Sequence, residues 1–156
     1  MSNSNVWFQI VAFNEPFGHL LYYVLQAAGH DVGLTIANLS DIVERVRGES
    51  PDVLVIELDQ DGYAMVAVER LQSQADTAAI PIVAVSSEPE LLALARKSLG
   101  IRFTLRAPWD LKEAFALFAE VASAIRGTTS TKSTRRPIRQ RRPPAPFDIT
   151  RKQDAG

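Results

Sequence analysis

The segment from Pro51 to Glu57 constrains the fold of this chain more strongly than any other. Its sequence, PDVLVIE, is continuously apolar from Val53 to Ile56 and ends in a carboxylate. A continuous apolar run of this length is typical of a strand that is covered on both faces, as in a parallel sheet. The segment therefore predicts a strand inside a parallel sheet, with Glu57 at its carboxyl end.

Segments typical of strands and helices alternate along the first 126 residues. Five strands are predicted at residues 6–13, 32–36, 53–56, 80–85 and 101–105. Five helices are predicted to follow them, beginning after Asn14, at Asp41, after Gly62, and at the capping boxes Ser87-x-x-Glu90 and Asp110-x-x-Glu113. The alternation predicts an α/β protein with the flavodoxin-like (βα)5 fold, in which helices cover both faces of a five-stranded parallel sheet.

Charge divides the chain into two parts. Residues 128–156 carry eight Lys/Arg and two Asp, which gives +6, whereas residues 1–127 carry nine basic and sixteen acidic side chains, which gives −7. The last segment is also rich in Pro and poor in apolar residues, so it offers little burial to offset the entropy cost of ordering. We therefore expect a folded domain over residues 1–127 and a disordered, basic Arg/Pro-rich tail over residues 128–156.

Composition excludes several classes of function. The absence of Cys excludes disulfides, thiolate catalysis and Cys-ligated zinc, and two His residues are too few for a His-rich metal site. The N-terminus lacks the pattern of a signal peptide, and no apolar run approaches the roughly 20 residues needed to span a bilayer. These features predict a soluble, cytoplasmic protein without a transmembrane segment.

In a sheet of this kind, functional sites lie at the carboxyl ends of the strands. The residues expected there are Phe13 and Asn14 after the first strand, Glu57 after the third, Ser86 after the fourth, and Arg106 and Ala107 after the fifth. The chemistry of the protein is therefore expected to depend on this small group of side chains.

The spacing of several short motifs resembles that of bacterial response-regulator receiver domains over residues 6 to about 126. The motifs are Val11-x-x-Asn14-Glu15-Pro16, the segment Pro51 to Ile56, the segment Ile80 to Ser86, and Gly100 followed by Ala107-Pro108-Trp109. The resemblance implies a receiver fold and a role in two-component signalling. Receivers of this family phosphorylate an Asp through bound Mg²⁺, using two acidic residues, a Ser or Thr, and a Lys.

The chain departs from this receiver pattern at most of the reactive positions. The acidic pair corresponds to Phe13 and Asn14, the acceptor Asp to Glu57, and the Lys to Ala107, while Ser86 retains the hydroxyl. Mg²⁺ requires hard oxygen ligands, usually including carboxylates, which a phenyl ring and a neutral amide do not replace. The resemblance therefore implies a degenerate pocket, a pseudo-receiver with no catalytic residue, no metal and no cofactor.

Some of these side chains admit two interpretations. Glu57 is interpreted as a polar residue at a strand end, solvated or paired with Arg106, in preference to a mimic of aspartyl phosphate. Asp59 and Asp61 are interpreted as turn residues before Gly62, with an alternative acceptor or weak cation site as the other reading. Ser86 is equally consistent with a hydrogen bond to Glu57 and with a strand terminator.

Two surfaces are candidates for binding a partner protein. The first helix has no charged residue from Pro16 to His30; its face with Phe17, Leu20, Leu21, Val24, Leu25 and Ala28 is expected to pack on the sheet. His19, Tyr22, Tyr23 and Gln26 are then expected to face outward, although an ordinary helix that lacks charge is equally consistent. The second surface is a basic patch around the fifth strand, with Arg96, Lys97, Arg102, Thr104, Arg106 and Lys112.

The tail adds a third group of candidate contacts. Arg135, Arg136, Arg139, Arg141 and Arg142 are suited to an acidic protein, nucleic acid phosphates or an anionic surface. We expect a phosphorylation-independent adaptor, not an enzyme, that binds another signalling protein in a bacterial regulatory pathway. The alternative is a regulator whose tail binds nucleic acid non-specifically while the receiver fold serves as a dimerisation platform.

Overall fold

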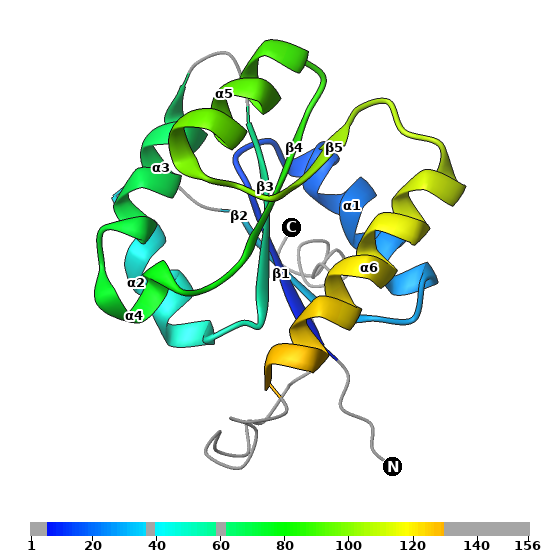
Figure 1. Cartoon of the computed structure of the whole chain (residues 1–156), viewed down its shortest axis with the longest axis horizontal. Coiled ribbons are helices and arrows are strands. Elements are labelled where there is room, and N and C mark those ends of the chain that lie inside the picture. The colour runs from blue at the N-terminus through cyan, green and yellow to red at the C-terminus, as the bar shows by residue number, and fades with distance from the viewer. Residues whose placement is uncertain (1–5, 37–39, 59–61, 130–156) are drawn as a thin grey trace, which may run out of the picture.

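The computed structural model describes residues 6–36, 40–58 and 62–129 and contains one five-stranded parallel sheet (Figure 1). The strands are β1 (Trp7–Ala12), β2 (Asp31–Ile36), β3 (Val53–Glu57), β4 (Ile82–Ser86) and β5 (Phe103–Arg106). Their order across the sheet is β2-β1-β3-β4-β5, and every neighbouring pair is parallel. The flavodoxin-like fold predicted from the sequence is therefore confirmed.

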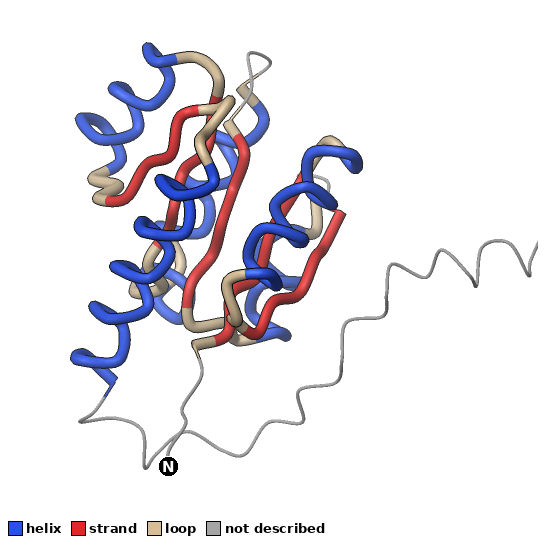
Figure 2. The backbone as a smooth tube through the Cα atoms, turned by 90° about the vertical axis from the view of Figure 1, so that its right-hand side faces the viewer, coloured by secondary structure: helices blue, strands red, loops and turns tan. Residues whose placement is uncertain are grey.

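Helices cover both faces of the sheet. They are α1 (Glu15–Ala27), α2 (Ile42–Glu49), α3 (Tyr63–Gln72), α4 (Ala75–Ala78), α5 (Pro89–Leu99) and α6 (Leu111–Thr129). Figure 1 shows α1 and α6 on one side of the sheet and α2, α3, α4 and α5 on the other. Figure 2, turned by 90°, shows α1 lying over the side of the sheet that ends in β2.

Two apolar clusters fill the spaces between the sheet and its helix layers. Alternate residues of β1 supply both clusters, since Phe8 and Ile10 point to the α1 and α6 side while Val11 points to the other. All four residues of the run from Val53 to Ile56 are fully buried. This burial on both faces explains why β3 shows no polar alternation, as the sequence indicated.

The described residues contain one more helix than the five predicted. The short helix α4 (Ala75–Ala78) follows α3 after a turn, and its buried Thr77 hydroxyl donates a hydrogen bond back to the Leu71 carbonyl of α3 at 2.6 Å. Arg47 on α2 forms a bidentate ion pair with Asp76 in this helix. A four-residue helix contains too little periodicity to be recognised from sequence.

Helix α1 is rotated relative to the prediction. Tyr22 was expected to face outward and is only 3% exposed, whereas Leu20 was expected in the core and is 49% exposed. The reason is Gly18, where an added Cβ would lie 2.8 Å from Ala12 Cβ and 2.9 Å from Leu34 Cδ1. The helix approaches the sheet most closely at this glycine, so the stripe that includes Gly18, Leu21, Tyr22 and Leu25 is buried.

The predicted start of α5 is wrong, whereas α6 begins directly after Asp110, as predicted. Helix α5 begins at Pro89 with Glu88 as its cap, and Ser87 makes no capping hydrogen bond, so the predicted capping box is wrong. Helix α6 begins at Leu111, next to Asp110, whose Oδ1 accepts a hydrogen bond from the Lys112 N–H at 3.2 Å. Leu111 is 54% exposed, and the buried stripe of α6 begins at Ala114.

Candidate functional site

The parallel register brings the predicted strand-end residues to one edge of the sheet. Val11 lies beside Ile56, Glu57 beside Val85, and Ser86 beside Arg106. Phe13 and Asn14 directly follow β1, and Ala107 directly follows β5. Two backbone hydrogen bonds also join neighbouring strand ends. The Ala107 N–H donates to the Ser86 carbonyl at 2.9 Å, and the Leu58 N–H donates to the Val85 carbonyl at 2.8 Å.

The two residues after β1 serve the fold. Asn14 caps α1, since its Oδ1 accepts a hydrogen bond from the Phe17 N–H at 3.0 Å. Phe13 is half-buried and packs against the apolar cluster beneath α2, α3 and α5. The oxygen atom that Asn14 offers is therefore already used as a helix cap, and Phe13 offers no ligand atom.

Ser86 is held inside the loop that follows β4. Its side chain is 1% exposed, and its Oγ accepts a hydrogen bond from the Glu88 N–H at 3.0 Å. This bond fixes the turn into α5, which agrees with the strand-terminator reading of Ser86. Glu57, the last residue of β3, is half-buried at the same edge.

These residues do not fit the Mg²⁺ site of a receiver. Among the described residues that end β1, β3, β4 and β5, Glu57 alone carries a carboxylate. In the same described part of the chain, no group of three or more His, Asp or Glu side chains is arranged to hold a metal ion. Asp59 and Asp61 lie outside the described residues.

The outward surface of α1 contains three of the four residues predicted for it. Tyr23 is 53% exposed, Gln26 is exposed, and His19 is half-buried with its Nε2 3.9 Å from Glu15 Oε2. Tyr22 lies beneath them, with its ring perpendicular to that of Tyr23 at a centroid distance of 6.0 Å. Burial and the neighbouring Tyr23 raise the pKa of the Tyr22 hydroxyl above its ordinary value.

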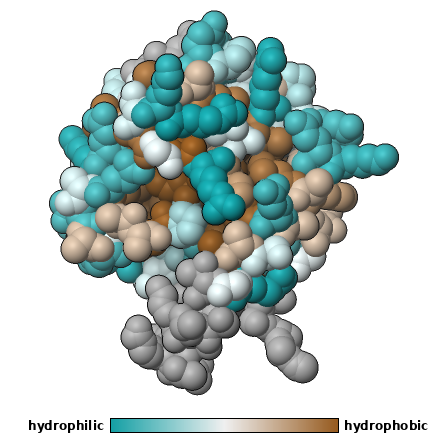
Figure 3. Space-filling view, in the orientation of Figure 1, coloured by the Kyte–Doolittle hydropathy of each residue, from teal (hydrophilic) through white to brown (hydrophobic). Residues whose placement is uncertain are grey.

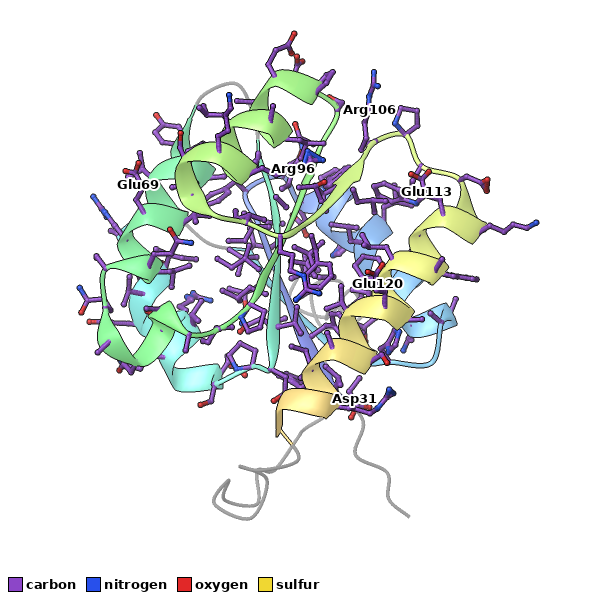
Figure 4. All side chains as sticks on the ribbon, viewed as in Figure 1. Asp31, Glu69, Arg96, Arg106, Glu113 and Glu120 are labelled. Carbon is purple, nitrogen blue, oxygen red and sulfur yellow. The ribbon has the colours of Figure 1, made fainter. Side chains whose placement is uncertain are left out.

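The second predicted surface lies along the edge strand β5. Arg96 on α5 donates a hydrogen bond from Nη2 to Thr104 Oγ1 at 2.9 Å, and the Arg102 guanidinium lies 4.7 Å from the Phe103 ring centroid. Arg106 is exposed at the end of β5. Figure 4 shows Arg96 and Arg106 on the same side of the molecule as Glu113 and Glu120 of α6.

Hydrophilic side chains surround apolar ones on this face. Figure 3 shows teal side chains above and beside a brown hydrophobic area between α5 and α6. Lys97 and Lys112 are also exposed. Sequence reasoning identified the cations here but missed Glu113 and Glu120 on the adjoining helix, whose exposed positions could have been read from the apolar period of α6.

A shallow pocket of about 440 Å³ lies away from the strand ends, between α2 and the turn after α3. Its lining includes Arg47, Arg70 and Glu44. Arg47 is already engaged by Asp76, and the neighbouring carboxyl end of α3 carries partial negative charge. These features give the pocket no clear preference for a charged ligand. The predicted tail contacts from Arg135 to Arg142 lie outside the described residues.

Comparison with known proteins identifies the fold. No protein-family model and no curated protein matches the chain. Among solved structures, the chemotaxis protein CheY4 of Vibrio cholerae is 16% identical with a TM-score of 0.64, and the match covers 76% of this chain and 99% of that one. A response regulator receiver domain from Methylobacillus flagellatus is 18% identical with a TM-score of 0.62, covering 78% and 99%.

A third structure shows what the fold can hold in another protein. The receiver domain of the sensor histidine kinase PA1611 from Pseudomonas aeruginosa, which has a magnesium ion coordinated in its active-site cleft, is 18% identical with a TM-score of 0.55. The match covers 80% of this chain and 97% of that one. These similarities show that the chain has the CheY-like fold of response-regulator receiver domains.

Proposed function

We propose that this chain is a phosphorylation-independent pseudo-receiver that acts as a protein-protein interaction module in a bacterial regulatory pathway, in the cytoplasm. The observation that carries the proposal is the use of the strand-end positions. Asn14 is a helix cap, Phe13 belongs to an apolar cluster, and Ala107 has no charge. Each supports the fold, and none supplies the charge that phosphoryl transfer needs.

The energetic argument concerns charge neutralisation. Phosphoryl transfer depends on positioning and on cations that stabilise the charge on the phosphoryl oxygens. Without a Mg²⁺ carboxylate pair and a Lys, Phe13, Asn14 and Ala107 supply neither the metal site nor the cation that would stabilise a phosphoryl group on Glu57. The proposal therefore assigns Glu57 no acceptor role and assigns the module no enzymatic activity.

The surface along β5 is the one we propose for an acidic protein partner. Arg96 on α5, Arg102 just before β5 and Arg106 at the end of β5 are all exposed. Arg guanidinium groups pair well with carboxylates and are enriched at protein interfaces. Glu113 and Glu120 on α6 border them, so the matching partner surface is acidic opposite α5 and β5 and basic or neutral opposite α6.

The test is an affinity capture from native, nuclease-treated lysate with the full chain and with residues 1–129, read by mass spectrometry. We expect both baits to recover the same protein, and the double variant Arg102→Glu/Arg106→Glu to lose it. Arg70→Glu, an exposed charge reversal on α3, is the matched control and should retain it. Recovery that requires the tail and disappears with nuclease would instead support non-specific nucleic acid binding.

A further inference from the structure

The β5 edge of the sheet has backbone groups that can pair with another strand. β5 is the last strand of the sheet, and Figure 1 shows it between α5 and α6. The Ala107 N–H donates to the Ser86 carbonyl of β4. Because successive N–H groups of a strand point in opposite directions, those of Thr104 and Arg106 point away from β4. An edge strand with such outward groups is a template for pairing with another chain.

Three guanidinium groups lie along this edge, one for every second residue of the strand. Arg102 directly precedes β5, and its guanidinium lies 4.7 Å from the Phe103 ring centroid. Arg96 Nη2 donates to Thr104 Oγ1 at 2.9 Å, which places a second guanidinium beside the middle of the strand. Arg106 ends β5 and is exposed, as are Arg96 and Arg102. The cations therefore follow the strand at intervals of about 6.6 Å, the distance between alternate strand residues.

The charge of this edge selects among the strands that could pair with it. Positive side chains on an edge oppose pairing with another positive strand, since like charges directly opposite each other are destabilising. A second copy of β5 would bring the same arginines together, and the segment from residue 128 to 156 carries +6. A strand with carboxylates is attracted to the same positions. The edge therefore favours an acidic strand from another protein over either strand from this chain.

We propose that the β5 edge binds an extended acidic segment of a partner protein as a sixth strand of the sheet, with a carboxylate at every second residue. The carboxylates then lie opposite Arg96, Arg102 and Arg106. Backbone hydrogen bonds to Thr104 and Arg106 hold the segment extended, so the main chain and the charges recognise it together. The inference rests on the proposed function, because it specifies how the same surface binds its acidic partner.

The other face of the added strand lies toward α6. Phe103 and Leu105 belong to the apolar cluster beneath α1 and α6, so Thr104 between them points to the α5 side. Side chains of the added segment alternate in the same way, which leaves the residues between its acids on the α6 side. Glu113 and Glu120 are exposed on α6 (Figure 4). We therefore expect the intervening residues of the segment to be uncharged or basic.

The first test is fluorescence anisotropy of synthetic peptides with the full chain. The probe is a labelled peptide with the core Glu-Val-Glu-Val-Glu between Gly-Ser flanks, and the control has the same composition with the core Val-Glu-Glu-Glu-Val. Only the alternating core aligns all its carboxylates with one side of an extended strand. We expect it to bind at least about 3-fold more tightly than the control. Equal binding of the two peptides, or binding of neither, would overturn the proposal.

The second test removes the outward N–H in the middle of the edge. Thr104→Pro deletes this donor, and proline is tolerated on an edge strand where the N–H faces solvent. Thr104→Val keeps the N–H and is the matched control, since both variants lose the hydroxyl that Arg96 contacts. We expect Thr104→Pro to bind the alternating peptide at least about 10-fold more weakly than Thr104→Val. Equal affinities of the two variants would contradict strand addition.

Methylated peptides test the same hydrogen bonds with the unaltered protein, so the result does not depend on how Thr104→Pro folds. One methyl group is placed on each backbone nitrogen of the alternating core in turn. Because successive N–H groups point in opposite directions, we expect weaker binding at every second position only. A uniform loss, or no loss at any position, would show that the peptide does not bind as a strand.

A charge reversal separates this inference from the proposed function. Arg102→Glu/Arg106→Glu should weaken the alternating peptide at least about 10-fold, and Arg70→Glu on α3 should not. If affinity capture recovers a partner that depends on Arg102 and Arg106 but is unaffected by Thr104→Pro, strand addition is wrong and the proposed function stands. If the captured partner does not depend on the two arginines, the proposed acidic contact fails and this inference fails with it.

Discussion

Gly18 shows how one residue determines the orientation of a whole helix. It is buried on α1 where the helix touches Ala12 and Leu34, and a Cβ at this position would approach both side chains to less than 3 Å. Without a Cβ, the helix lies close enough to bury Tyr22 and turn Leu20 outward. The sequence pattern of α1 contained the right apolar residues but gave no weight to the glycine between them.

Replacing this glycine with alanine tests two opposing effects on stability, which are tighter packing against the sheet and higher helix propensity. We predict that Gly18→Ala destabilises the protein by about 1–3 kcal/mol, because overpacking outweighs the gain of about 1 kcal/mol in helix propensity. Gly48→Ala in α2 is the control, since nothing lies within 4 Å of its added Cβ. We expect that variant to be neutral or stabilised. Urea denaturation measures both, and a stabilised Gly18→Ala would contradict the packing argument.

Asn14, which follows β1 at the candidate site, allows the contribution of a helix cap to stability to be measured. Its Oδ1 caps α1 through the Phe17 N–H. We predict that Asn14→Ala costs about 1 kcal/mol in the free energy of unfolding, whereas Asn14→Asp retains the cap and stays within about 0.5 kcal/mol of the original chain. Equal losses in the two variants would show that the cap does not stabilise the helix.

Among the elements, those built from long, regular patterns were predictable and those fixed by contacts were not. The run from Val53 to Ile56 predicted β3, and the alternation of elements predicted a five-stranded parallel sheet covered on both faces. The sequence did not predict three other features: the short α4, the start of α5 and the exposure of Leu111. Each depends on a local hydrogen bond or on where a neighbouring helix lies. The strand-end residues were predicted to meet, but the capping role of Asn14 removes its oxygen from any metal site.

The junction of α1, β2 and α6 carries a pH-dependent interaction. The His30 ring lies 4.8 Å from the Phe8 ring centroid, and both its burial and the positive charge of Arg126 lower its pKa, against a smaller opposing effect of Asp31. The folded state therefore binds a proton at His30 less readily than the unfolded chain does. Stability from this group is complete above the unfolded pKa of about 6.5 and is lost as pH falls through that value toward the lower folded pKa.

This sign gives a direct prediction. The urea midpoint of the original chain should fall between about pH 7.5 and pH 5.5, and His30→Gln should show a smaller fall over the same range. His19 is present in both proteins, so the difference between them isolates His30. A variant whose pH dependence is as steep as that of the original chain would assign the effect to other groups.

At the scale of the whole molecule, Arg96, Arg102 and Arg106 along β5 are the residues that we propose contact an acidic partner protein. Within residues 6–36, 40–58 and 62–129, no helix is long and apolar enough to cross a membrane. The proposed contact uses the folded domain and does not require phosphorylation at the carboxyl ends of the strands.

The claim that the strand-end residues do not support phosphorylation is tested most directly by intact-mass spectrometry. The full chain is measured after incubation with acetyl phosphate and Mg²⁺. We predict the unmodified mass with and without Mg²⁺, because Phe13, Asn14 and Ala107 provide neither the metal ligands nor the cation that phosphoryl transfer requires. An acid-labile phosphoryl adduct that forms only with Mg²⁺ and disappears in Glu57→Gln would contradict the account and assign the chain an active phosphoacceptor.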